Sequence, residues 1–206
     1  MQISSKETVD LIREKITAII RHAAEDSVRL QSHNSEFKLA EPERKYKLGQ
    51  VLGNRMSLIL VSGETLRITF KLHYNIGEIK FIAHRAYGKG TPEELSDKQA
   101  MDFMKELCNL SAGQVVKIFE ENNLPLGMSL PLGARGFYDI FADYSPATQP
   151  FVKYGDLWSM KFADCTIMIS AVIEMLDTHA LSNILKYEVP LKAANDKGED
   201  EEIDFL

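Results

Sequence analysis

The sequence has few cysteines, no long apolar run and no excess of basic residues. Its two cysteines, Cys108 and Cys165, lie far apart among 206 residues and match no metal-ligand spacing. We expect two buried, reduced thiols, which is consistent with a cytoplasmic location. No segment reaches the ~18 consecutive apolar residues that a membrane-spanning helix requires, and no apolar stretch of a signal peptide follows the first residues. We therefore expect a cytoplasmic protein without membrane insertion.

The charge distribution argues against nucleic acid as a partner. The net charge is −6, but residues 196–206 contain six acidic residues and one lysine. The rest of the chain is therefore nearly neutral, and no basic stripe stands out in the sequence. We expect one domain over residues 1–192, followed by an acidic, disordered tail over residues 193–206.

Hydrophobic spacing predicts an α+β fold with a mainly antiparallel sheet packed against a few helices. Apolar residues at helical spacing predict one helix over residues 5–28, and a capping pattern at Ser96–Gln99 predicts another over Asp97–Glu121. A last helical piece is expected over residues 178–185. Alternating or continuous apolar residues predict strands over residues 56–61, 66–74, 79–86, 157–162 and 166–171. In the second of these strands, the alternation places His73 on a solvent-exposed face.

The predicted helix over residues 97–121 has a polar stripe on an otherwise apolar surface. Asp102, Glu106, Asn109 and Gly113 fall within about 60° of one another at ~100° of rotation per residue. The apolar side chains of this helix lie on its other side. The sequence thus presents a carboxylate, an amide and a bare backbone together on one outward face.

This stripe resembles the signature of the CheC/CheX/FliY chemotaxis phosphatases. The match runs through Asp-x-x-x-Glu-x-x-Asn and extends from Glu106 to Gly113, and Pro131 fits the proline of the family pattern. The single copy of the motif is similar to the CheX arrangement. The family usually has a further helix between its first strands and the motif helix, and the strand expected over residues 79–86 departs from that order.

The resemblance implies dephosphorylation of a CheY-like response regulator. Glu106 would pair with a lysine of the phosphorylated partner, and Asn109 would orient the attacking water. Asp102, Gly113 and Pro131 would contact the partner. No cofactor of the chain's own is expected, because Mg²⁺ would be bound by the phosphorylated receiver domain. A homodimer is possible.

Elementary chemistry agrees with these roles. Phosphoryl transfer requires mainly positioning and charge stabilisation, and an amide can position water although it cannot act as a base. A carboxylate beside a phosphoryl group is repulsive unless a cation lies next to it. The stripe therefore makes sense as half of a site that a partner completes. Gly113, which lowers helix stability by about 1 kcal/mol relative to alanine, would allow that partner to approach closely.

Other interpretations stay open at this stage. A Glu-x-x-Asn pair on a helix is often only solvated, and the chain could be a non-enzymatic binding module or an adaptor that associates through a sheet edge. The loop Gly88–Thr91 and Arg135 could bind an anion, although a loop and a turn are the simpler interpretations. The five histidines show no ligand spacing, and we expect no metal site. The final residues 202–206 are similar to the Glu-Ile-Asp peptide with which the flagellar protein FliM captures CheY.

Overall fold

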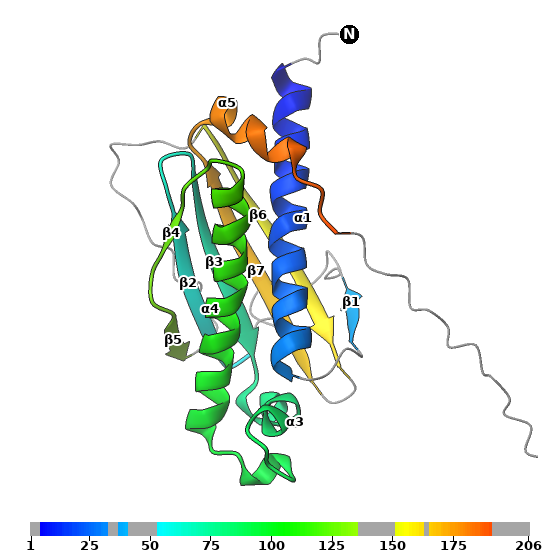
Figure 1. The fold of residues 1–206 in the computed structure, drawn as a ribbon. Helices are drawn as coiled ribbons and strands as arrows, with labels where there is room; N and C mark the ends of the chain where they lie inside the picture. Colours follow the sequence, from blue (N-terminus) through cyan, green and yellow to red (C-terminus); the bar gives the residue numbers. More distant parts are fainter. Residues whose placement is uncertain (1–4, 33–36, 41–52, 136–150, 163–164, 191–206) are drawn as a thin grey trace, which may run out of the picture.

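The computed structural model describes residues 5–32, 37–40, 53–135, 151–162 and 165–190. They form two layers, in which two long helices, α1 and α4, cover one face of a seven-stranded sheet (Figure 1). The strand order is β1-β6-β7-β3-β2-β4, with β5 also paired to β2, and every pairing is antiparallel. The predicted α+β class with a mainly antiparallel sheet is confirmed. The predicted tail lies outside the described residues.

The elements follow one another in a simple order along the chain. The helical elements are α1 (Ser5–Ser32), α3 (Ile76–Ala86), the 3₁₀ turn η1 (Pro92–Glu94), α4 (Asp97–Glu121), α5 (Thr178–Leu181) and the 3₁₀ turn η2 (Ser182–Lys186). The strands are β1 (Lys38–Ala40), β2 (Arg55–Ser62), β3 (Leu66–Tyr74), β4 (Gly127–Met128), β5 (Leu132–Arg135), β6 (Val152–Lys161) and β7 (Thr166–Met175). No helix among the described residues is both long enough and apolar enough to cross a membrane.

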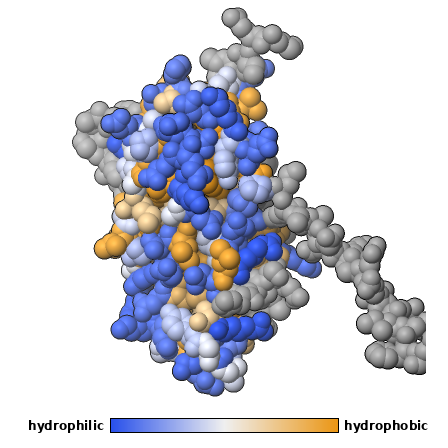
Figure 2. Space-filling view, viewed as in Figure 1, coloured by the Kyte–Doolittle hydropathy of each residue, from blue (hydrophilic) through white to orange (hydrophobic). Residues whose placement is uncertain are grey.

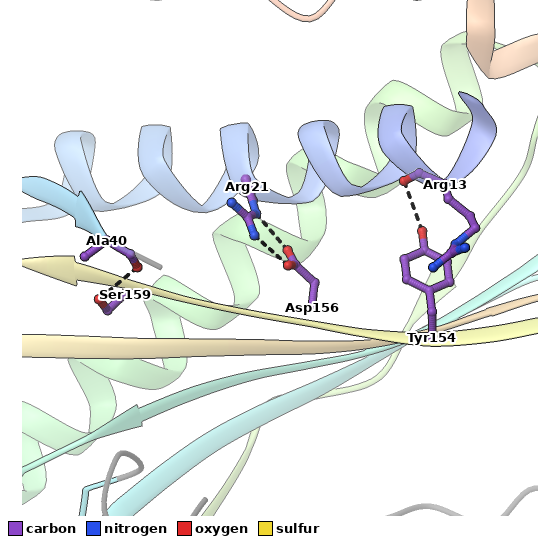
Figure 3. Close-up of polar contacts among 6 residues, drawn as sticks. All are labelled: Arg13, Arg21, Ala40, Tyr154, Asp156 and Ser159. Carbon is purple, nitrogen blue, oxygen red and sulfur yellow. Dashed lines mark hydrogen bonds and ion pairs between the residues drawn. The ribbon is translucent and has the colours of Figure 1, made fainter. Parts of the chain in front are cut away.

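Helix α1 is fixed to strand β6 by polar contacts as well as by its apolar face. Its buried isoleucines recur at helical spacing, as the sequence predicts. The Arg21 guanidinium points at the Asp156 carboxylate, and the Tyr154 hydroxyl donates a hydrogen bond to the Arg13 carbonyl (Figure 3). At the far end of β6, Ser159 donates to the Ala40 carbonyl of β1. The first two contacts fix the position of α1 over the sheet, and the third joins β6 to β1.

Helix α4 has the bounds that its capping residues predict. The Ser96 hydroxyl accepts a hydrogen bond from the Gln99 backbone, and the Gln99 side chain accepts one from the Ser96 backbone. At the other end, Asn123 adopts a left-handed conformation (φ 60°), and the Leu124 amide donates to the Phe119 carbonyl. Because both ends are specified locally, the helix begins and ends where the sequence indicates.

The strand predicted over residues 79–86 is wrong. This segment belongs to helix α3, which buries Ile79, Ile82 and Ala83 and leaves Phe81 44% exposed. The spacing i, i+3, i+4 of the buried residues is helical, and the alternation of Ile79, Phe81 and Ala83 coincides with it only in part. The chain therefore has a helix at the place where the resemblance expects one, between the first strands and the motif helix.

The expectation that β3 has a solvent-exposed face is also wrong for the second half of the strand. His73 is 3% exposed and Lys71 is fully buried. The His73 Nε2 lies 2.8 Å from the Ser170 hydroxyl on the neighbouring strand β7. Alternation identifies the two faces of a strand, but it does not reveal whether a second face is covered.

Candidate functional site

The four residues of the polar stripe lie together on the outward face of α4. Asp102 and Glu106 are exposed, and Asn109 and Gly113 are partly exposed. The buried residues of the helix, among them Met104, face the sheet on the opposite side. The geometry that the spacing predicts is thus present, with Glu106 and Asn109 one turn apart.

The polar groups at the centre of the stripe have no partner within the described part of the chain. Neither the Glu106 carboxylate nor the Asn109 amide makes a hydrogen bond or an ion pair there. Asp102 has a loose ion pair, with its Oδ1 3.8 Å from the Lys105 Nζ. An exposed pair at this distance contributes little to stability. The Glu106 and Asn109 side chains therefore remain available to an external molecule.

Gly113 is not required by packing against the described residues. A Cβ atom built at this position would have no atom of another element within 4 Å. A glycine that lowers helix stability without relieving a contact is consistent with a surface that another molecule approaches closely. The outward side of α4 is open at this turn.

The structure adds Tyr87 to the surroundings of the stripe. This residue is the C-cap of α3 and is 39% exposed. Burial and then the charges of Asp102 and Glu106 raise the pKa of its hydroxyl, so the group stays protonated and can donate a hydrogen bond. Sequence reasoning misses Tyr87 because it expects no helix α3 that would bring the residue beside α4.

Pro131 lies between the short strands β4 and β5 at the edge of the sheet, and not on the stripe itself. Ser129 fixes this segment to β2, since its amide donates to the Leu60 carbonyl and its hydroxyl accepts from the Leu60 amide. The next residues run beside α4, where a Cβ on Gly133 would lie 3.1 Å from the Lys105 Cε. The structure thus places Pro131 on the flank of the motif helix.

The same edge exposes several apolar side chains. Met128, Leu130 and Leu132 are 46%, 83% and 57% exposed. On the helical side of the molecule, apolar patches interrupt a mostly hydrophilic surface (Figure 2). Exposed apolar side chains next to the stripe are suited to contact with another protein.

The Gly88–Thr91 loop and the two cysteines have structural roles. The Gly88 amide donates to the Arg85 carbonyl and the Lys89 amide to the His84 carbonyl, which ends helix α3 and leaves neither amide for an anion. Cys108 and Cys165 are buried, and burial raises the pKa of the Cys108 thiol. No cluster of three or more histidine, cysteine or acidic side chains suited to a metal occurs among the described residues.

Comparisons with known proteins identify the fold. No protein-family model matches the sequence, and no curated protein is significantly similar to it. A CheC-like superfamily protein from Shewanella sp. PV-4 superposes with a TM-score of 0.61 at 16% identity, over 78% of this chain and 97% of the other. CheX from Vibrio vulnificus gives 0.60 at 15% identity, over 77% and 96% of the two chains.

A third structure includes a partner protein. A chain of the CheX–CheY–BeF₃–Mg²⁺ complex from Borrelia burgdorferi gives a TM-score of 0.55 at 12% identity, over 76% of this chain and 96% of the other. These similarities show that the chain has the CheC/CheX-like fold. The resemblance that the motif indicates is thereby confirmed at the level of the fold.

Proposed function

We propose that this protein is a phosphatase that acts on a phosphorylated, CheY-like receiver domain in chemotaxis or two-component signalling. The observation that carries the proposal is the pair Glu106 and Asn109, exposed one turn apart on α4 without an internal partner among the described residues. The fold adds support, because a CheX chain with the same fold was crystallised with CheY.

Asn109 would hold the attacking water in line with the phosphorus atom. An aspartyl phosphate is already reactive, so the catalyst has mainly to position the nucleophile. The amide offers both a donor and an acceptor to water and does not titrate near neutral pH. A hundredfold acceleration corresponds to about 2.7 kcal/mol of barrier, which one well-ordered water could supply.

Glu106 would form an ion pair with a lysine of the receiver. The unpartnered carboxylate supplies the negative charge, and the receiver supplies both the cation and the phosphoryl group with its Mg²⁺. Asp102, Gly113 and Pro131 would contact the receiver around this centre. The protein would thus supply half of the reaction centre.

The test measures the lifetime of the phosphorylated state of a CheY-like receiver. Wild-type protein should shorten the phosphate half-life, and Asn109→Ala should lose about a hundredfold of the acceleration while retaining its circular dichroism spectrum. Gln114→Ala is the matched control, because this amide lies on α4 away from the stripe; it should retain full activity.

Two outcomes would contradict the proposal. Full activity of Asn109→Ala would show that the assigned role of the amide is wrong. Binding of the receiver by wild-type protein without any change in phosphate half-life would favour the alternative, a non-enzymatic binding module.

A further inference from the structure

Two arginines face each other at the edge of the sheet beside α4. Arg55 of β2 and Arg135 of β5 are directly opposite in the antiparallel register. Side chains of such a pair lie on the same face of the sheet, with Cβ atoms about 5 Å apart. Like charges in this arrangement repel each other, so the pair lowers stability unless an anion is close.

Lys105 extends this pair to a cluster of three cations. Its side chain lies against Gly133 of β5, where a Cβ would be 3.1 Å from the Lys105 Cε. Gly133 and Arg135 are two residues apart on β5 and therefore lie on the same face of the sheet. Figure 1 shows β5 beside the first half of α4, the half of the helix that contains Asp102 and Glu106. We call Arg55, Lys105 and Arg135 the basic edge.

Nearby anions do not neutralise the basic edge. Asp97 is already bound by Lys80 at 2.7 Å, and Asp102 lies 3.8 Å from Lys105. Arg55 has a buried Nε without a hydrogen-bond partner, and Arg135 makes no hydrogen bond or ion pair with the described residues. Within the described part of the chain, the three cations face two carboxylates: Asp97, which is held mainly by Lys80 and also feels the charge of Arg55, and Asp102, which lies 3.8 Å from Lys105.

We propose that the basic edge docks an acidic surface of the phosphorylated receiver domain and so orients it over the stripe. This inference rests on the proposed function. Mg²⁺ in a phosphoryl site is bound by carboxylates together with phosphate oxygens, so the receiver surface around its phosphorylated residue is acidic. The basic edge attracts that surface, while Glu106 on the adjacent helix attracts its lysine. Because the basic edge and the Glu106 carboxylate attract oppositely charged parts of the receiver, they favour one orientation of the partner.

Arg135 is the position for the test, because it is exposed on an edge strand and its substitution leaves the core intact. The measurement is the dissociation constant for a CheY-like receiver loaded with beryllofluoride, at several salt concentrations. Arg135→Glu should weaken binding at least tenfold and reduce its salt dependence, and Arg135→Gln should give an intermediate loss. Lys161→Glu makes the same charge change on an exposed residue of β6, across the sheet, and should leave the affinity unchanged.

The outcomes separate this inference from the proposed function. Asn109→Ala should bind as wild type but fail to accelerate dephosphorylation, whereas Arg135→Glu should raise the KM for the receiver and retain kcat. Unchanged affinity of Arg135→Glu, or an equal loss with Lys161→Glu, would overturn the docking role whatever the outcome for catalysis.

Inorganic phosphate distinguishes docking of a protein surface from a site for a small anion. Phosphate should compete with the receiver no better than chloride at equal ionic strength. Competition by phosphate at concentrations where chloride has no effect, abolished in Arg135→Gln, would identify a small-anion site and overturn the proposal.

Discussion

The Arg21 guanidinium donates two hydrogen bonds to the Asp156 carboxylate, from Nε to Oδ2 at 2.8 Å and from Nη2 to Oδ1 at 2.6 Å. The Asp156 side chain is only 14% exposed, and the same guanidinium lies 5.2 Å from the Trp158 ring centroid. A two-point ion pair over an aromatic ring fixes both the distance and the orientation of its partners. It therefore determines how α1 lies across β6, 135 residues further along the chain.

Removing the carboxylate of this pair should lower the free energy of unfolding. Asp156→Ala removes the two-point ion pair of the partly buried Arg21, and we expect a loss of about 1–3 kcal/mol. Denaturant unfolding followed by the fluorescence of Trp158, the single tryptophan, measures the change. Asp10→Ala, which removes the exposed pair with Arg13, should cost under about 1 kcal/mol. Equal losses in the two variants would contradict the assigned importance of the Arg21–Asp156 pair.

Gly113 should show opposite effects on stability and activity. Gly113→Ala should stabilise the protein by up to about 1 kcal/mol, because alanine favours the helix and its Cβ meets no other element. The larger side chain of Gly113→Leu should instead impair dephosphorylation by blocking the receiver. Thermal unfolding and the phosphate half-life measure the two effects.

Gly77 provides the control, since it also lies in a helix and a Cβ there would meet no atom within 4 Å. Gly77→Leu should leave the phosphate half-life as in wild type. Full activity of Gly113→Leu would mean that the receiver does not approach this turn of α4.

A charge exchange tests the role of Glu106. Glu106→Lys should abolish productive binding, because it places a cation opposite the receiver lysine, and Glu106→Gln should weaken binding about tenfold. A receiver in which that lysine is replaced by glutamate should recover binding to Glu106→Lys. Kinetic assays of the four combinations measure the coupling, and its absence would exclude this ion pair.

The ion pair between Lys80 and Asp97, which joins α3 to α4, should make stability depend on pH. The hydrogen bond and charge of Lys80 lower the pKa of Asp97 below its ordinary value of 3.8. A lowered folded-state pKa stabilises the protein above the unfolded-state value, and the contribution disappears as the pH falls through the folded-state pKa. Asp97→Asn should therefore be less stable than wild type at neutral pH, and the difference should shrink in acid. A difference that persists at the lowest pH would contradict this linkage.

The sequence predicts α4 well because the information is local. Ser96 and Gln99 specify its start, Asn123 specifies its end, and the apolar period specifies its buried face. The sequence does not predict helix α3, because the apolar residues 79–83 fit both strand alternation and helical spacing. Only the packing of this segment against α4 decides between a strand and a helix. The sequence does not predict the burial of His73 either, because whether the second face of a strand is covered depends on distant parts of the chain.

By itself, the sequence determined that a carboxylate, an amide and a glycine share one face of a helix, since a fixed rotation per residue relates positions 106, 109 and 113. The tertiary structure decided that this face points away from the sheet, that Tyr87 comes close to it, and that Arg55 and Arg135 oppose each other at its flank. Those relations join residues far apart in the chain. They depend on strand register and on the packing of the helices, which no local pattern specifies.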